Sequence, residues 1–392
     1  MTETITMPAG RPTPFDPPAE LALLRERGPI VPLAYPDGHQ GWLVTGHALA
    51  REVLADPRFS ARSELRHLPI ASEAAQGRPA PPGLFVAMDP PEHTRYRHLL
   101  TGEFTVRRMR RLTERIEEVT RTCLDAMERQ GPQADLVAAF AAPIPAVVIC
   151  ELLGVPEADR PAFIAQMTRL SGSELTVEEK YASFAAVQGQ IKELVAAKRA
   201  APSDDLLSGL TRGDLDDDEL ATIGFMLLGA GLDTTANMLA LGTFALLEHP
   251  GAAAALFEDV DQAVEELLRY LSIVPFLVRT ALEDLDLGGV RVAKGESVTV
   301  SLAAADRDPG RFHSPDLLDP SRRSGSHVAF GHGVHQCLGQ QLARVEMRVA
   351  FPALFARFPS LRLAVPAAEV PLRTDMAIYG VHRLPVAWDA PQ

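Results

Sequence analysis

The chain of 392 residues contains little cysteine: only Cys123, Cys150 and Cys337, which lie far apart. An odd number at such spacing offers neither a disulfide framework nor the paired cysteines of a zinc site. Cysteine used in this way is typical of a reducing compartment, and we expect a cytoplasmic protein. A cysteine cluster and a glycine-rich dinucleotide fingerprint are both absent, which excludes an iron–sulfur or flavin domain in this sequence.

An excess of positive charge is also lacking. The net charge is −13, which argues against a general nucleic-acid-binding protein because the surface as a whole would repel a phosphate backbone. The segment Met1–Pro18 lacks the basic and apolar regions of a signal peptide, so we expect neither secretion nor anchoring there. Residues 1–14 are polar and proline-rich, and we expect them to be disordered.

Strand patterns are few, and helical periodicity dominates. Alternation typical of strands occurs at Gly41–Thr45, at Val290–Val300 and after Leu361. Helices are predicted over Val106–Arg129, Asp135–Leu153, Glu178–Arg199, Glu219–Leu247 and Asp259–Leu271. Because no repeat or long linker interrupts the chain, we predict a mainly α protein with a minor β region, forming one domain over residues 15–392.

One stretch, Ile223–Leu247, is long and apolar enough to suggest a transmembrane helix. Polar residues such as Asp233 and Asn237 interrupt its middle, and no basic loop flanks it. A helix that crosses a large soluble core fits these features better, so we expect no membrane association.

The segment Phe330–Gly339 carries the strongest chemical signal. Cys337 stands where a glycine-containing loop becomes a helix, and backbone N–H groups and the helix dipole at such a point favour a thiolate. Gly331 and Gly333 would let the backbone pass close to a flat ligand. The alternative is a buried, inert cysteine beside a turn.

This segment resembles the heme-binding loop of the cytochrome P450 family, Phe-x-x-Gly-x-(His or Arg)-x-Cys-x-Gly. Phe330, Gly333, His335, Cys337 and Gly339 fill its defined positions. The resemblance extends from about residue 15 to the end of the chain. It implies the P450 fold, with heme b (iron protoporphyrin IX) between the long helix and the cysteine loop, Cys337 as iron ligand and His335 at a heme propionate.

A second motif is Ala230–Thr235, which resembles the oxygen-binding segment of the same family. Its adjacent acid and alcohol are Asp233 and Thr234. The resemblance implies that they deliver protons to bound dioxygen, which a carboxylate beside a hydroxyl could do. The alternative is a hydroxyl bonded to a carbonyl four residues earlier and a carboxylate paired with a distant arginine.

Further positions match the family's cofactor-binding residues. Asp89–Glu92 has the form of a capping box that begins a helix, and four-residue spacing directs His93 and Arg97 of that helix to one side. By resemblance, these two residues and Arg279 contact the heme propionates.

Glu266 and Arg269 share one helix face and resemble a buried structural pair of the family. A downstream Arg or His usually joins that pair, but Leu317 stands where we expect it. Arg322 or Arg323 could substitute.

The resemblance implies a monooxygenase that inserts one oxygen atom of O2 into an apolar small molecule, with electrons from NAD(P)H through a ferredoxin and its reductase. We expect a bulky substrate, such as a polyketide, macrolide or terpenoid intermediate of antibiotic or other secondary metabolism, and a monomeric enzyme. We expect apolar residues to line the substrate pocket. They are Phe85, Val86, Met226, Ala230, Val274, Phe276, Leu277 and Ile378.

Two alternatives remain open. A peroxide-using enzyme of the same fold would need no proton relay, and a heme-bound carrier or sensor would not turn over. Asp233 and Thr234 favour O2-dependent catalysis over both.

Overall fold

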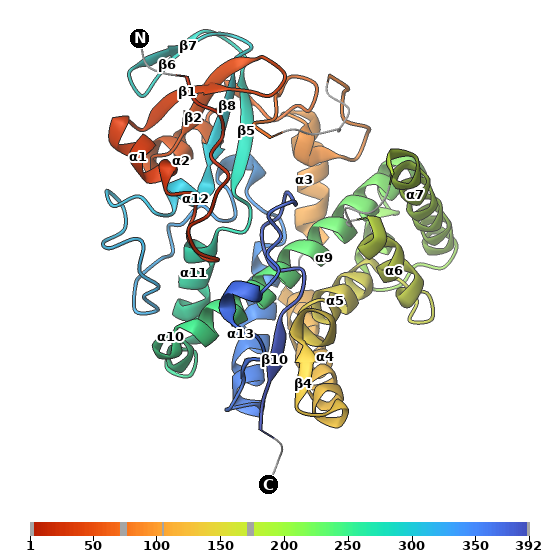
Figure 1. Ribbon diagram of the computed structural model, residues 1–392. Coiled ribbons are helices and arrows are strands. Elements are labelled where there is room, and N and C mark those ends of the chain that lie inside the picture. The colour runs from red at the N-terminus through yellow and green to blue at the C-terminus, as the bar shows by residue number, and fades with distance from the viewer. Residues whose placement is uncertain (1–3, 71–76, 104–105, 171–175, 390–392) are drawn as a thin grey trace. The chain divides into compact units, whose positions relative to one another are not determined.

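The computed structural model describes residues 4–70, 77–103, 106–170 and 176–389. The chain packs into two compact units built from interleaved segments (Figure 1). The first unit comprises Met1–Ala80, Val86–His93 and His249–Gln340, and the second comprises Pro81–Phe85, Thr94–Glu248 and Gln341–Gln392. That residues 15–392 form one domain stays a prediction.

A five-stranded sheet organises the first unit. Its strand order is β1 (Ile30–Ala34), β2 (Gln40–Val44), β8 (Ser297–Ser301), β5 (Phe276–Ala281) and β3 (Phe59–Ser60). Neighbouring strands are antiparallel except β2 and β8, which are parallel. A hairpin of β6 (Leu285–Leu287) and β7 (Val290–Val292) and the helices α1 (Glu20–Arg27), α2 (His47–Ala55), α10 (Pro250–Ala255), α11 (Val260–Leu271) and α12 (Leu302–Ala305) complete this unit.

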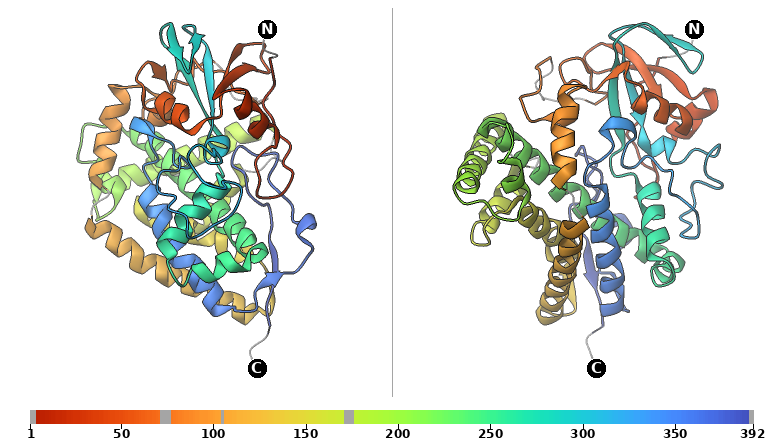
Figure 2. Two further views of the ribbon diagram at one scale, coloured as in Figure 1. Left: turned by 90° about the vertical axis from the view of Figure 1, so that its left-hand side faces the viewer. Right: turned by 180° about the vertical axis from the view of Figure 1, so that it is seen from behind.

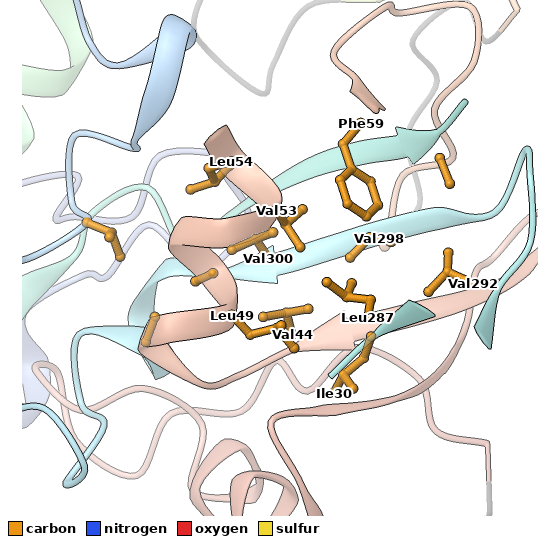
Figure 3. Close-up of a cluster of buried hydrophobic side chains, with 14 of the residues drawn as sticks. Ile30, Val44, Leu49, Val53, Leu54, Phe59, Leu287, Val292, Val298 and Val300 are labelled. Atoms are coloured by element: carbon orange, nitrogen blue, oxygen red, sulfur yellow. The ribbon is translucent and has the colours of Figure 1, made fainter. Parts of the chain in front are cut away.

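The apolar core of the first unit lies between α2 and this sheet (Figure 3). Val53 and Leu54 of α2 pack in one cluster with Val298 and Val300 of β8. The polar positions of β8 are buried too, which is possible because they find hydrogen-bond partners. The Tyr35 hydroxyl lies 2.9 Å from Thr299 Oγ1 and donates to the Ser297 carbonyl over 3.1 Å.

The second unit is helical, and its segment from orange through green in Figures 1 and 2 carries α4 to α9. Its helices are α4 (Val106–Gln130), α5 (Pro143–Leu153), α6 (Arg160–Leu170), α7 (Val177–Ala200), α8 (Leu206–Leu210) and α9 (Asp217–Glu248), with α13 (Gln340–Arg357) following the first unit. The helix α3 (Glu92–Glu103) continues from one unit into the other. A small antiparallel sheet has the order β4 (Gln133–Asp135), β10 (Pro385–Ala387) and β9 (Arg362–Leu363).

The long helix α9 is the core helix of the second unit. Among the described residues it alone is long and apolar enough to cross a membrane, but half of its most apolar window is buried in protein. It packs against α5 and α7, and at Gly231 an added Cβ would lie only 2.9 Å from Ile149 of α5. This packing agrees with the predicted soluble core helix.

The predicted helices at α4, α7, α9 and α11 are confirmed to within two residues at each end. The predicted helix Asp135–Leu153 is wrong at its first residue, because Asp135 pairs with Pro385 in the small sheet. The Asp135 carboxylate also accepts hydrogen bonds from the Val137 and Leu384 amides. A π-helical segment follows, and the α-helix begins only at Pro143, where the missing N–H costs nothing.

Part of the segment expected to be disordered is instead ordered against the sheet. Ile5 forms a parallel bridge with Leu33, and its carbonyl accepts a 2.7 Å hydrogen bond from the Ala34 amide. Ile5 and Met7 also pack against a small apolar cluster around Leu33. Burial of these two side chains explains the order, which the polar composition of the segment concealed.

The pair Glu266–Arg269 is confirmed as a fully buried ion pair with contacts of 2.8 Å from both carboxylate oxygens. Its third member is Arg322, whose Nε lies 3.2 Å from Glu266 Oε1. Arg322 thus substitutes for the residue that the family usually has at position 317, where Leu317 is 64% exposed and contributes only its backbone carbonyl. Ser324 Oγ also donates to the Glu266 carboxylate.

We expect Arg322→Gln to lower the free energy of unfolding by roughly 1–3 kcal/mol, because a buried carboxylate would lose a charged donor. The neighbouring Arg323→Gln is the matched control, since Arg323 is exposed. Its effect should stay within about 0.5 kcal/mol in urea denaturation. Equal effects of the two substitutions would contradict the role given to Arg322.

Candidate active site

The Cys337 loop lies in the first unit and is closed by its own backbone. The Cys337 amide donates to the Phe330 carbonyl over 2.9 Å, and the Gln336 amide donates to the Gly333 carbonyl over 3.0 Å. Cys337 is exposed, whereas Cys123 and Cys150 are buried, and burial raises the pKa of each of those two thiols to about 11. Cys337 is therefore the one cysteine placed to bind a ligand.

Glycine is required in this loop by both conformation and contact. Gly331 and Gly333 have φ values of 70° and 75°, in the region that favours glycine. A Cβ on Gly333 would lie 2.4 Å from the carbonyl oxygen of Leu54, near the end of α2. The helix that covers the core thus also supports the back of the cysteine loop.

The structure brings together two of the predicted propionate-binding residues. The rings of His93 and His335 lie 4.1 Å apart, and His93 is 1% exposed. Arg97 lies one turn after His93 on α3. The predicted capping box is wrong, because α3 begins only at Glu92; the Asp89 carboxylate accepts hydrogen bonds from Ser60 Oγ and from the Ala61 amide.

Arg279 of β5 has an unusual environment for a cation. It is 6% exposed, and its Nη1 donates a 2.9 Å hydrogen bond to the Val278 carbonyl. Burial lowers the pKa of its guanidinium to about 10. Burial also lowers the pKa of Arg66, a neighbouring arginine that the sequence did not single out.

These side chains of the first unit suit an iron porphyrin. An exposed thiol provides a soft ligand for iron, and glycines at 331 and 333 leave its loop without side chains at two positions. Buried donors at His93 and Arg279 have the chemistry to bind carboxylate groups. The residues present therefore fit a heme.

The acid and alcohol of α9 lie in the second unit and are both engaged. The Asp233 carboxylate accepts a 2.6 Å hydrogen bond from Arg373 Nη1 and a 3.0 Å bond from Asn237 Nδ2. The Thr234 hydroxyl donates to the Ala230 carbonyl over 2.8 Å. These contacts are the structural alternative that the sequence left open, so the catalytic roles of Asp233 and Thr234 stay predictions.

A cavity of about 840 Å³ lies beside α9 within the second unit. Asp233, Asn237 and Arg373 line it together with apolar residues such as Ala146 and Met167. Sequence reasoning missed this cavity, because its walls come from the π-helical segment, α5, α6, α7, α9 and the C-terminal segment.

The predicted substrate residues are divided between the units. Phe85, Met226, Ala230 and Ile378 belong to the second, and none of the four lines its cavity. Val86, Val274, Phe276 and Leu277 belong to the first. Val274 and Leu277 pack against its core cluster. The substrate pocket formed by these eight residues stays a prediction.

Sequence reasoning also missed Glu346 of α13. This side chain is 3% exposed and is hydrogen-bonded to Thr235, the neighbour of Thr234 on α9. Burial raises the pKa of its carboxyl to about 8, so the group is protonated at neutral pH. Glu346 was missed because its burial depends on tertiary packing that local sequence does not reveal.

We expect Glu346→Gln to stabilise the protein at alkaline pH. The folded state holds this proton more tightly than the unfolded chain does, so stability from this group is complete below pH ~4.5 and declines as the pH rises through about 8. The amide cannot ionise, and we expect a gain of roughly 2–4 kcal/mol at pH 8 that vanishes near pH 4.5. Urea denaturation across this range, with the exposed Glu369→Gln as control, measures it; a gain independent of pH would contradict the assignment.

Comparisons with known proteins agree with these features. The family model for cytochrome P450 matches residues 175–265 and 260–374. The chain is 51% identical to cytochrome P450 105C1 of Streptomyces sp. over 98% of each chain. It is 43% identical to pentalenic acid synthase of Streptomyces avermitilis over 98% of this chain and 97% of the relative.

Solved structures extend the likeness to the backbone. The crystal structure of CYP105P1 in complex with filipin I matches with a TM-score of 0.93 and 41% identity over 100% of both chains. The fold is therefore mainly α with a minor β region, as predicted. The chain belongs to the cytochrome P450 family of heme-iron monooxygenases and is similar to its bacterial CYP105 enzymes.

Proposed function

We propose that this monooxygenase inserts one oxygen atom of O2 into a bulky, mostly apolar small molecule, such as a polyketide, macrolide or terpenoid intermediate of secondary metabolism. The complete Phe330–Gly339 loop with its exposed Cys337 carries the oxygenase assignment. The apolar character of the predicted walls supports the substrate class, since such walls gain affinity by dehydrating hydrocarbon surface. A pentalenic acid synthase and a filipin-bound structure among the relatives also support it.

In this proposal Cys337 binds the iron of heme b as a thiolate, and His93, Arg97, Arg279 and His335 bind the heme carboxylates. A thiolate-ligated heme, when bound, supplies the chemistry for cleaving the O–O bond of dioxygen. The loop's hydrogen bond from the Cys337 amide to Phe330 fixes the position of the sulfur-bearing residue. In this part of the site, the chain thus positions the iron ligand and binds the carboxylates of the heme.

Asp233 and Thr234 are proposed to deliver protons. Asp233 borders the cavity beside α9, so water there can exchange protons with its carboxylate. Arg373 and Asn237 hold that carboxylate in place. For transfer, the Thr234 hydroxyl must leave the Ala230 carbonyl, to which it now donates.

The electron donor is proposed to be an acidic ferredoxin, reduced by its NAD(P)H-dependent reductase in the cytoplasm and acting on a monomeric enzyme. Residues 94–121 contain eight Arg and four Glu, a local excess of +4. The structure weakens this argument, because Asp204 pairs with Arg107, Arg108 and Arg111. The attraction between the ferredoxin and this segment would then depend on fewer positive charges. The dependence of the reduction rate on ionic strength measures that attraction.

We expect Cys337→Ser to abolish the red-shifted absorption band of the reduced, CO-treated protein, because that band marks thiolate-bound heme. Cys150→Ser is the control, since Cys150 is buried in α5 and should not affect the band. A retained band in Cys337→Ser would refute the ligand assignment. Absence of the band in the wild type would refute the proposed function itself.

We expect Thr234→Ala to bind heme normally while diverting most electrons from NAD(P)H into peroxide instead of product. The measurement is the ratio of product to NAD(P)H consumed. Thr222→Ala is the control, because Thr222 makes the same hydrogen bond to a carbonyl four residues earlier on α9. Unchanged coupling in Thr234→Ala would remove this residue from the mechanism and favour the peroxide-using alternative.

A further inference from the structure

Arg66 belongs to a three-residue segment that is fixed at both ends to the sheet of the first unit. The Leu65 carbonyl accepts a 3.0 Å hydrogen bond from Thr280 Oγ1 of β5. The His67 amide donates a 3.0 Å hydrogen bond to Ser297 Oγ of β8. Thr280 and Ser297 are directly opposed in the sheet, so one cross-strand pair holds the backbone on both sides of Arg66.

The side chain of His67 strengthens this attachment. Its Nδ1 lies 2.6 Å from the Asp37 carboxylate, and its ring stacks on His39 at 3.7 Å with an angle of 1° between the planes. His39 in turn accepts a 3.1 Å hydrogen bond from the Ser297 amide. The segment is therefore held by backbone and side-chain contacts, and the position of Arg66 is fixed by its neighbours.

Arg66 and Arg279 form a pair of like charges with little compensation. Arg279 precedes Thr280 on β5, so the anchor of Leu65 lies one residue from it. Burial lowers the pKa of both guanidinium groups. The positive charge of Arg66 lowers the pKa of Arg279 further. Among the described residues, neither arginine forms an ion pair with an acid. The acid whose charge favours that of Arg279 is Asp89, and its carboxylate already accepts hydrogen bonds from Ser60 and Ala61.

Two guanidinium groups that are removed from water, and of which one disfavours the charge of the other, are unfavourable unless an anion compensates them. A carboxylate is the fitting anion, because a guanidinium presents parallel N–H donors to its two oxygens. We propose that Arg66 is a further cofactor-binding residue, which together with Arg279 binds a carboxylate of the heme. This inference rests on the family's heme cofactor and adds a residue outside the sequence motifs.

The test is the rate at which heme leaves the enzyme for an excess of apomyoglobin, followed by the Soret absorption. Arg66→Gln should accelerate heme loss roughly 10-fold, the effect of one charged hydrogen bond to a carboxylate. Arg66→Lys keeps the charge and should lose heme at an intermediate rate. Arg62→Gln is the matched control, because Arg62 is exposed and pairs with Glu64 at 2.6 Å, and it should behave as the wild type.

Reconstitution with heme dimethyl ester separates a direct contact from a structural effect. With both carboxylates esterified, wild type and Arg66→Gln should lose the cofactor at equal rates, since the anion that Arg66 binds is gone. An equal acceleration with heme and with its ester would overturn the proposal, as would unchanged loss of native heme from Arg66→Gln. Failure of the wild type to take up heme would instead refute the family-level function, which keeps the two failures distinct.

Discussion

The buried ion pair between Glu266 and Arg269 holds the segment that leads to the Cys337 loop. Arg269 donates to the carbonyls of Asp306 and Pro315 over 2.7 and 2.8 Å, and Glu266 accepts from the Asp319 amide over 2.9 Å. A buried pair of this kind gains little stability by itself, because desolvation offsets the attraction. Its effect is on specificity: its hydrogen bonds to the backbone restrict the conformation of the irregular chain after α12.

This constraint continues to the edge of the active site. The buried Asp306 carboxylate accepts a 2.8 Å hydrogen bond from the Val328 amide, two residues before the cysteine loop begins. Burial raises the pKa of Asp306, and hydrogen bonds from Val328 and Ser272 oppose that rise. Irregular backbone is thus fixed by buried polar groups, and the loop itself needs only glycine conformations and its own hydrogen bonds to present Cys337.

In the second unit, one set of contacts fixes an acid for which we propose a catalytic role. Asp233 is tied to Arg373 of the C-terminal segment and to Asn237 on its own helix, so it stabilises the unit as it stands. The same carboxylate borders a cavity, where a relay acid would need water. Glu346 differs, because it is protonated at neutral pH and is hydrogen-bonded to Thr235, and it therefore adds no charge to the middle of α9.

The sequence alone determined the features that depend on neighbouring residues: the cysteine loop, the acid and alcohol of α9, and four long helices whose periodicity reflects a buried face. Only the tertiary structure decided which residues distant in the sequence form contacts. Glu266 and Arg322 are 56 residues apart, and Leu65 meets Thr280 across 215. Asp135 leaves the expected helix for the same reason, since its pairing strand comes from the C-terminal end of the chain. Local sequence favours a local conformation, whereas the burial and pairing of a residue depend on which distant segments pack against it.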